Sequence, residues 1–274
     1  RCTTPRTTCA TQRASPATKP GGSLTPMFQK LMTGALIAGG AAGLLAAFLH
    51  FSFVQEYILM GERYEYGEIV HFQTAPTSTE SHDHVAPEQP AAMGADTHDH
   101  SPSAPSADNV FSRNALTIGF TVVLYVAYAM LMIAAFGVAA QFGIIIGATQ
   151  GALWGLTGFA AFQLAPAMGL PPELPGTVAP DLGVRQVWWW GTVFATGLGV
   201  GLIAYGRSVV LAVGGVVLLA APHVIGAPQL DEFFSYAPAE LGAAFSARVL
   251  GVGLVVWVVM GSLAGLLWSR TQEA

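Results

Sequence analysis

Long apolar stretches that carry almost no charge are the feature that most limits what this chain can fold into. Of its 274 residues, 53% are hydrophobic and 10% are charged, whereas an ordinary soluble domain has about 25% charged residues. A helix needs about 20 apolar residues to cross a bilayer. Six stretches reach or approach that length, at about residues 31–53, 116–136, 143–164, 187–205, 209–225 and 241–268. The sequence therefore predicts an all-α polytopic membrane protein, a bundle of about six transmembrane helices.

The fourth and fifth stretches are separated by Gly206-Arg207-Ser208. A charged side chain in the middle of a membrane is costly, so we expect a tight hairpin between two helices. If the two stretches formed one helix, the bundle would have five spans.

The distribution of charge predicts the orientation. Six spans place seven basic residues on the side of the termini and three on the other side, where fifteen of the sixteen acidic residues also lie. Cytoplasmic ends are enriched in Lys and Arg. We therefore expect an inner-membrane protein with both termini in the cytoplasm.

The chain divides into a leader and a membrane domain. Residues 1–26 are rich in Thr, Arg and Pro and contain Cys2 and Cys9, whereas Met27 opens a segment typical of a natural start. We expect 1–26 to be disordered, or not translated at all, and 27–270 to form the transmembrane domain. The alternative is that the first stretch is a cleaved signal peptide, but it is longer than the apolar region of about 7–15 residues that such peptides have.

The connection of residues 54–115 is the expected non-cytoplasmic loop. Residues 55–72 are acidic and aromatic, which suits an amphipathic helix at the membrane surface. Residues 73–109 are rich in Pro, Ser, Ala, Asp and His, a composition that cannot bury a core and predicts disorder.

One tripeptide occurs twice in the disordered part, as His82-Asp83-His84 and His98-Asp99-His100. Imidazole binds transition metals well and carboxylate tolerates many divalent ions, so the two tripeptides together predict a flexible metal-capture segment. The alternative is a solvated acidic linker in which the histidines are incidental.

The other three histidines lie at or near the same membrane boundary. His50 and His223 are close to the outer ends of their stretches, and His71 and Glu56 lie in the membrane-proximal part of the loop. We predict all four as metal ligands, the alternative for His50 and His223 being an interfacial histidine bonded to a loop. Arg248 is expected to reach the outer face or to pair with an outer carboxylate.

Glycines at a spacing of four predict close helix packing. Gly143, Gly147, Gly151 and Gly155 share one face, and similar pairs are Gly39 with Gly43, Gly197 with Gly201, and Gly261 with Gly265. Gln163, in the third stretch, is expected to bond between helices rather than to hold an ion.

Motifs for other functions are missing from the sequence. Neither lysine follows a glycine-rich loop, so the chain has no Walker A motif, and it contains no Ser/His/Asp arrangement and no HExxH motif. The net charge of −5 and the lack of a basic stripe argue against a nucleic-acid partner. We expect no enzyme, and no cofactor apart from a bound or transported metal.

Four segments resemble a known family: GERYEYGE at 61–68, GFAAFQLAPAMGLPPELPG at 158–176, RQVWWW at 185–190 and APHVIGAP at 221–228. From Met27 to about Arg270 the chain is similar to CbtA, the predicted cobalt transporter subunit of bacterial cobalamin-linked loci. The resemblance implies cobalt uptake with a small single-span, histidine-bearing partner called CbtB. Descriptions of the family often count five spans.

The leading hypothesis is therefore a membrane subunit for uptake of a divalent transition metal, Co²⁺ by resemblance, with Ni²⁺ as an alternative because nickel binds such ligands more tightly. The alternative function is a non-transporting metal-binding scaffold or accessory subunit. The expected partners are the metal ion, the lipid bilayer and a CbtB-like subunit.

Overall fold

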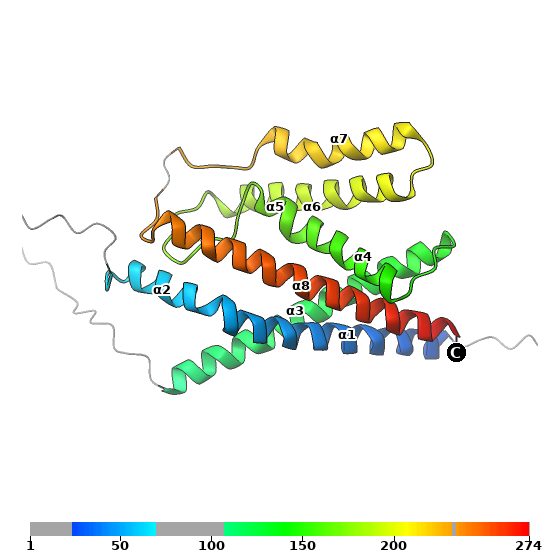
Figure 1. Cartoon of the computed structure of the whole chain (residues 1–274), viewed down its shortest axis with the longest axis horizontal. Coiled ribbons are helices and arrows are strands. Elements are labelled where there is room, and N and C mark those ends of the chain that lie inside the picture. The colour runs from blue at the N-terminus through cyan, green and yellow to red at the C-terminus, as the bar shows by residue number, and fades with distance from the viewer. Residues whose placement is uncertain (1–23, 70–106, 232–233, 274) are drawn as a thin grey trace, which may run out of the picture.

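The computed structural model describes residues 24–69, 107–231 and 234–273, and these form a bundle of helices (Figure 1). The elements are α1 (Leu24–Phe53), α2 (Gln55–Glu65), α3 (Ala107–Gln141), α4 (Ala148–Phe159), the π-helical turn η1 (Ala160–Leu164), α5 (Ala165–Ala167), α6 (Leu182–Tyr205), α7 (Val209–Ile225) and α8 (Ala239–Glu273). Apart from one isolated bridge between Thr177 and Ser235, the described residues contain no β-structure. The predicted all-α membrane bundle is confirmed.

Each of the six predicted spans coincides with a helix. Four helices, α1, α3, α6 and α8, are long and apolar enough to cross a membrane, and α7 is a shorter apolar helix. The third span is made of α4, η1 and α5 in continuous succession. Its predicted start was wrong, because Gly143 adopts a φ of 77° in a turn and the helix begins five residues later, at Ala148.

The connections define two ends of the bundle. At one end, the loop end, lie α2, the connection from α5 to α6 and the connection from α7 to α8 (Figure 1). At the C-terminal end lie the last turns of α8 and the connections from α3 to α4 and from α6 to α7. This alternation is the one that six crossings require.

The hairpin predicted between the fourth and fifth spans is also present. α6 ends at Tyr205 and α7 begins at Val209. Ser208 caps α7, its hydroxyl accepting a hydrogen bond from the backbone N–H of Leu211 at 3.2 Å, a common way to satisfy the free donors of a first helical turn. The two helices pack along each other in antiparallel fashion (Figure 1).

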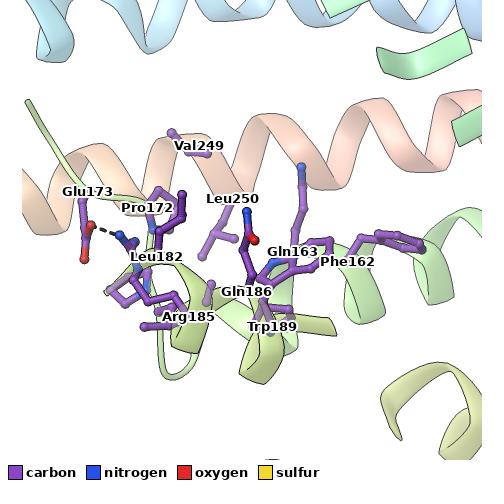
Figure 2. Close-up of a pocket in the computed structure, with 14 residues that line it drawn as sticks. Phe162, Gln163, Pro172, Glu173, Leu182, Arg185, Gln186, Trp189, Val249 and Leu250 are labelled. Carbon is purple, nitrogen blue, oxygen red and sulfur yellow. Dashed lines mark hydrogen bonds and ion pairs between the residues drawn. The ribbon is translucent and has the colours of Figure 1, made fainter. Parts of the chain in front are cut away.

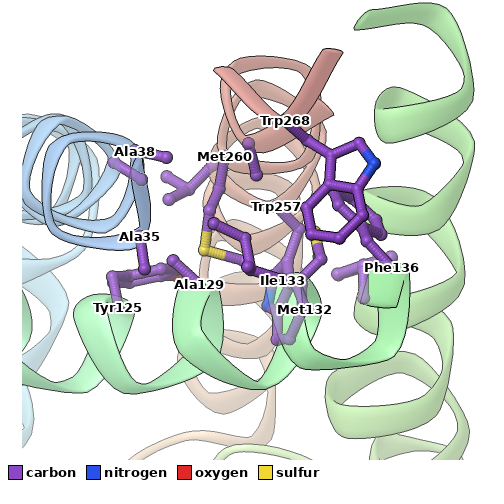
Figure 3. Packing of buried hydrophobic residues seen from close by; sticks show 14 of the residues in the cluster. Ala35, Ala38, Tyr125, Ala129, Met132, Ile133, Phe136, Trp257, Met260 and Trp268 are labelled. Atoms are coloured by element: carbon purple, nitrogen blue, oxygen red, sulfur yellow. The ribbon is translucent and has the colours of Figure 1, made fainter. Parts of the chain in front are cut away.

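The core lies where α1, α3 and α8 meet. Figure 3 shows Ala35 and Ala38 of α1 on the side of Tyr125 and Ala129 of α3, whereas Phe136 of α3 lies on the other side of the cluster, beside Trp268. Met260 and Trp268 of α8 complete the cluster. Lipid tails are as apolar as these side chains, so close packing rather than removal from water holds such a core together.

Glycine contacts bring α4 and α8 together backbone to backbone. A Cβ on Gly151 would collide with the carbonyl oxygen of Gly261, and a Cβ on Gly265 would collide with that of Gly147. Gly155 packs in the same way on the carbonyl of Trp257. The packing predicted from the glycine spacing is confirmed for these positions but was wrong for Gly143, which lies in the turn before α4 and has nothing within 4 Å among the described residues.

The other two predicted glycine pairs have different outcomes. Gly39 and Gly43 lie against α3, where a Cβ on either would come within 2.5 Å of the Cα of Val126 or Val122. Gly197 and Gly201 have nothing within 4 Å, so the prediction of packing on that face of α6 was wrong. The close contact of α6 with α7 uses Gly199 instead, because a Cβ there would approach the carbonyl of Gly215 to 2.8 Å.

A small second cluster closes the loop end. Val54, Leu174, Ala237 and Phe245 are buried together, with side chains of α2 packed against them. The helix expected at the membrane surface is thus α2, and it holds the connection from α5 to α6 in place. The expected leader 1–26, apart from its last three residues, and the expected disordered segment 73–109, apart from its last three, lie outside the described residues.

Candidate functional site

A cavity of about 400 Å³, here called the vestibule, opens at the loop end between η1, α6 and α8. Figure 2 shows its lining: Glu173 and Arg185 lie at one end, and Gln163 and Gln186 lie further along with their amides directed toward α8. Phe162 and Trp189 border the same space. Few polar groups in an otherwise apolar hollow are typical of a ligand site.

The π-helical turn η1 decides which way Gln163 points. Eight residues of a regular α-helix turn through about 800°, which would leave Gln163 about 80° away from Gly155. A π-turn contains one extra residue, which shifts the direction of the following side chains about the helix axis by roughly 100°. Gln163 therefore faces α8, nearly in line with Gly155. Pro166 follows this turn and has no N–H to bond to the carbonyl of Phe162, which releases the helix from its regular pattern there.

Gln163 has an unusual position for a polar side chain. Among the described residues, its buried Oε1 has no hydrogen-bond partner, and it lies where a Cβ on Gly253 of α8 would be. Glycine at 253 is therefore what makes room for the amide. A buried carbonyl oxygen without a donor is costly, and such groups persist in proteins mainly where they have a use.

Glu173 and Arg185 form the charged pair of the vestibule. Arg185 Nη2 donates to Glu173 Oε2 at 3.0 Å, and the two side chains are 26% and 28% exposed. Asp181 caps the start of α6 by accepting hydrogen bonds from two backbone N–H groups, which places Arg185 one turn into the helix. The connection that carries Glu173 is anchored to α8 by Ser246, whose hydroxyl donates to the carbonyl of Pro172 at 2.6 Å.

Aromatic side chains separate the vestibule from a second cavity of about 190 Å³, here called the inner chamber. Phe162 lines both cavities. Its ring lies 5.6 Å from that of Trp257, 5.3 Å from that of Tyr128 and 6.0 Å from that of Trp189. Thr157 and Met132 also line the inner chamber, and the Nε1 of Trp257 is buried without a partner.

A third cavity, of about 680 Å³ and here called the outer groove, lies next to the vestibule at the loop end. It runs between the connection from α5 to α6, the connection from α7 to α8, and the first turns of α8. The outer groove and the vestibule share Leu170, Pro171, Pro172 and Glu173. The three cavities are therefore neighbours in a series.

The predicted metal ligands are placed only in part. His50 is half-buried near the end of α1, its ring edge-on to Phe51 at 5.6 Å. Glu56 is exposed in the first turn of α2, and His223 is half-buried near the end of α7, 6.2 Å from the ring of Trp188. All three lie toward the loop end, but α1 and α7 are at opposite edges of the bundle (Figure 1).

Within the part of the chain that the structure describes, no three His, Cys, Asp or Glu side chains come together as a metal-binding group. His71 and the two tripeptides, with His82, Asp83, His84, His98, Asp99 and His100, lie outside the described residues. The predicted ligand set therefore stays a prediction.

Arg248 was expected to reach the outer face or a carboxylate. Its guanidinium lies 4.6 Å from the centre of the Tyr57 ring of α2, a cation–π contact. The side chain is thus directed to the loop end.

The vestibule residues Glu173, Arg185 and Gln186 were not among the candidates from the sequence. The pairing joins residues twelve positions apart across an irregular connection, for which no periodicity gives a signal. The available hint was the Pro-rich segment around Glu173 directly after a span that contains a glutamine.

The chain matches one family model over residues 28–269, described as "Probable cobalt transporter subunit (CbtA)". The matched range includes nearly the whole bundle and all three cavities. No curated protein and no solved structure matches the chain.

Proposed function

The chain belongs to the CbtA family of probable cobalt transporter subunits, and on this premise we propose that it carries a divalent transition metal, Co²⁺ in the first place and Ni²⁺ as a competitor, into the cell. The observation that carries this proposal is the family match over almost the entire membrane domain. The family description names a transporter subunit, which favours transport over a metal-binding scaffold.

In this proposal the loop end faces the outside and both termini lie in the cytoplasm of an inner-membrane protein. Lys30, Arg207 and Arg270 support the orientation, since they lie at the C-terminal end of the bundle, whereas Glu173 and Asp181 lie at the loop end. Residues 54–115 are then an outer connection that begins with α2, ends with the first turns of α3 and carries the two tripeptides between them.

The two His-Asp-His tripeptides capture the ion outside and raise its concentration near the membrane. His50, Glu56, His71 and His223 then receive it around the loop end. Neutral imidazole is the ligand form, so capture weakens as the pH falls and imidazole takes up a proton, which free histidine does at about pH 6.5.

A subunit implies a partner, and we propose a small single-span protein with histidines of its own, as in CbtB. Transport should therefore be measured both with and without this partner.

The test is uptake of radioactive Co²⁺ into cells that express the full chain, with and without this partner. We expect uptake above background, reduced by excess Ni²⁺. Replacing His82, His84, His98 and His100 by Ala should lower uptake at limiting Co²⁺ and leave uptake at saturating Co²⁺ unchanged. The matched control replaces Ser101, Ser103 and Ser106 of the same loop by Ala.

The pH dependence adds a second readout. Between pH 7.5 and 5.5, uptake at limiting Co²⁺ should fall more steeply in the wild-type chain than in the four-histidine variant, which keeps His50, His71 and His223. The proposal would be overturned if cells that express the full chain took up no more Co²⁺ than cells without it, whether the partner is present or absent.

A further inference from the structure

The outer groove and the vestibule lie at the loop end, the inner chamber lies behind them, and each cavity shares at least one lining residue with the next. Glu173 is among the four residues common to the outer groove and the vestibule, and Phe162 is common to the vestibule and the inner chamber. A ligand from the surface could thus reach the vestibule through the outer groove, and it would have to pass the ring of Phe162 to enter the inner chamber.

We propose that this series is the route by which the cation enters the bundle from the loop end, with Glu173 as its first ligand and Arg185 as the side chain that the cation displaces. The proposal rests on the function proposed above and adds the site to it. It assigns no role to histidine along the route.

The charge at Glu173 is the first reason. The Glu173 side chain is 28% exposed, and its carboxylate is already bound to a guanidinium at 3.0 Å. A cation entering from the outer groove therefore competes with Arg185 for the same oxygen. The divalent ion brings two positive charges to a carboxylate that carries one negative charge, and the displaced guanidinium of Arg185 must turn away from it. The ion is therefore held only weakly at this point.

Neutral oxygens deeper in the vestibule are the second reason. Gln163 and Gln186 present amides beyond the ion pair, and the Oε1 of Gln163 is buried and unpartnered. Carbonyl and carboxylate oxygens hold a divalent transition metal less firmly than imidazole does. Weak ligands in succession suit passage, because an ion must leave each site as readily as it enters.

The aromatic partition is the third reason. Beyond Gln163 the ion meets the rings of Phe162, Tyr128 and Trp257. Aromatic faces attract cations, and a ring can turn more easily than a backbone can move. Phe162 is therefore the side chain that separates the two cavities and that must turn for the ion to pass.

The proposal is tested by opposite effects of two substitutions in the same ion pair. Binding of radioactive Co²⁺ is measured by equilibrium dialysis on the purified full chain in which His82, His84, His98 and His100 are Ala, so that loop capture does not mask the vestibule. Glu173→Gln should weaken binding by at least about tenfold, since a direct ion–carboxylate attraction is lost. Arg185→Gln should tighten binding severalfold, because the competing cation is gone.

If the ion pair is purely structural, each of the two substitutions should destabilise the fold. Co²⁺ binding should then be unchanged in both variants or lowered in both. Thermal unfolding of each variant separates the two cases. The matched controls are Arg63→Gln and Glu68→Gln, which break an exposed pair of 3.1 Å between α2 and the turn that follows it and should leave binding unchanged.

Changes in the same direction for Glu173→Gln and Arg185→Gln, or no change, overturn the route. Failure of the route is distinguishable from failure of the transport function, because in the first case the chain with intact loop histidines still takes up Co²⁺ in cells and Glu173→Gln does so at the wild-type rate.

Discussion

The contact of α8 with the helix formed by α4 and η1 is built in opposite ways in its two halves. Toward the C-terminal end, Gly151 and Gly261 let the two backbones touch. Toward the loop end, the Trp257 ring packs on Gly158, Gln163 reaches across to Gly253, and the vestibule opens beside them. One pair of helices is thus sealed in one half and open in the other.

The difference shows how side-chain size sets the distance between membrane helices. Without side chains between them, the backbones meet and leave no cavity. A ring or an amide inserted at the same interface holds the helices apart, and the space beside it stays free for a ligand. The π-helical turn η1 keeps Gln163 on the side of its helix that faces α8.

The largest expected effect comes from filling the sealed half. In Gly261→Ala, the new Cβ would collide with the carbonyl of Gly151 and come within 2.8 Å of the Cα of Gly155. A single backbone carbonyl cannot move away without the rest of its helix, so the two helices must separate. We expect the free energy of unfolding to fall by about 3 kcal/mol, seen as a lower midpoint of thermal unfolding in detergent. The control Gly251→Ala, on the same helix with nothing within 4 Å, should change stability by about 1 kcal/mol at most.

The two halves should also differ in access to water. Cys2 and Cys9 are the two cysteines of the sequence, so replacing both by Ser gives a background for single cysteines. Gln186→Cys in the vestibule should react with a water-soluble thiol reagent roughly a hundredfold faster than Ala264→Cys, because Ala264 is 0% exposed in the sealed half and a buried thiol stays protonated. Equal rates would show that the sealed half admits water.

The third expected effect is smaller, and it raises the stability of the protein while it lowers the rate of transport. Gln163→Leu removes the unpartnered buried oxygen, so we expect a gain of about 1 kcal/mol in unfolding free energy together with slower Co²⁺ uptake. Gln150→Leu, on an exposed position of α4, should change neither. A lower stability for Gln163→Leu would instead indicate that its amide is held by Tyr125, which lies next to it.

Much of the sealed half could be predicted from the sequence, and most of the open half could not. A spacing of four places Gly147, Gly151 and Gly155 on one helix face whatever lies opposite. The spacing alone does not say which face has a neighbour, and for this reason the pair Gly197 and Gly201 was assigned to packing although it lies open.

The open half depends on contacts between distant residues. A π-turn results from the balance of packing on both sides of a helix and leaves no periodic signal. The pairing of Glu173 with Arg185 needs a folded connection that α2 and Ser246 hold in place. The histidine tripeptides were visible in the sequence because repetition needs no fold, and they remain a prediction.

The sealed half has an electrical consequence. If the vestibule faces the outside and contains water, the outer potential extends as far as the aromatic partition, and the membrane voltage falls across the short glycine-packed remainder. Each elementary charge that crosses gains about 2.3 kcal/mol per 100 mV, so a divalent cation drawn toward a negative interior gains about twice that amount. The close backbone contact of α4 and α8 is then the insulating layer across which the voltage acts on the ion.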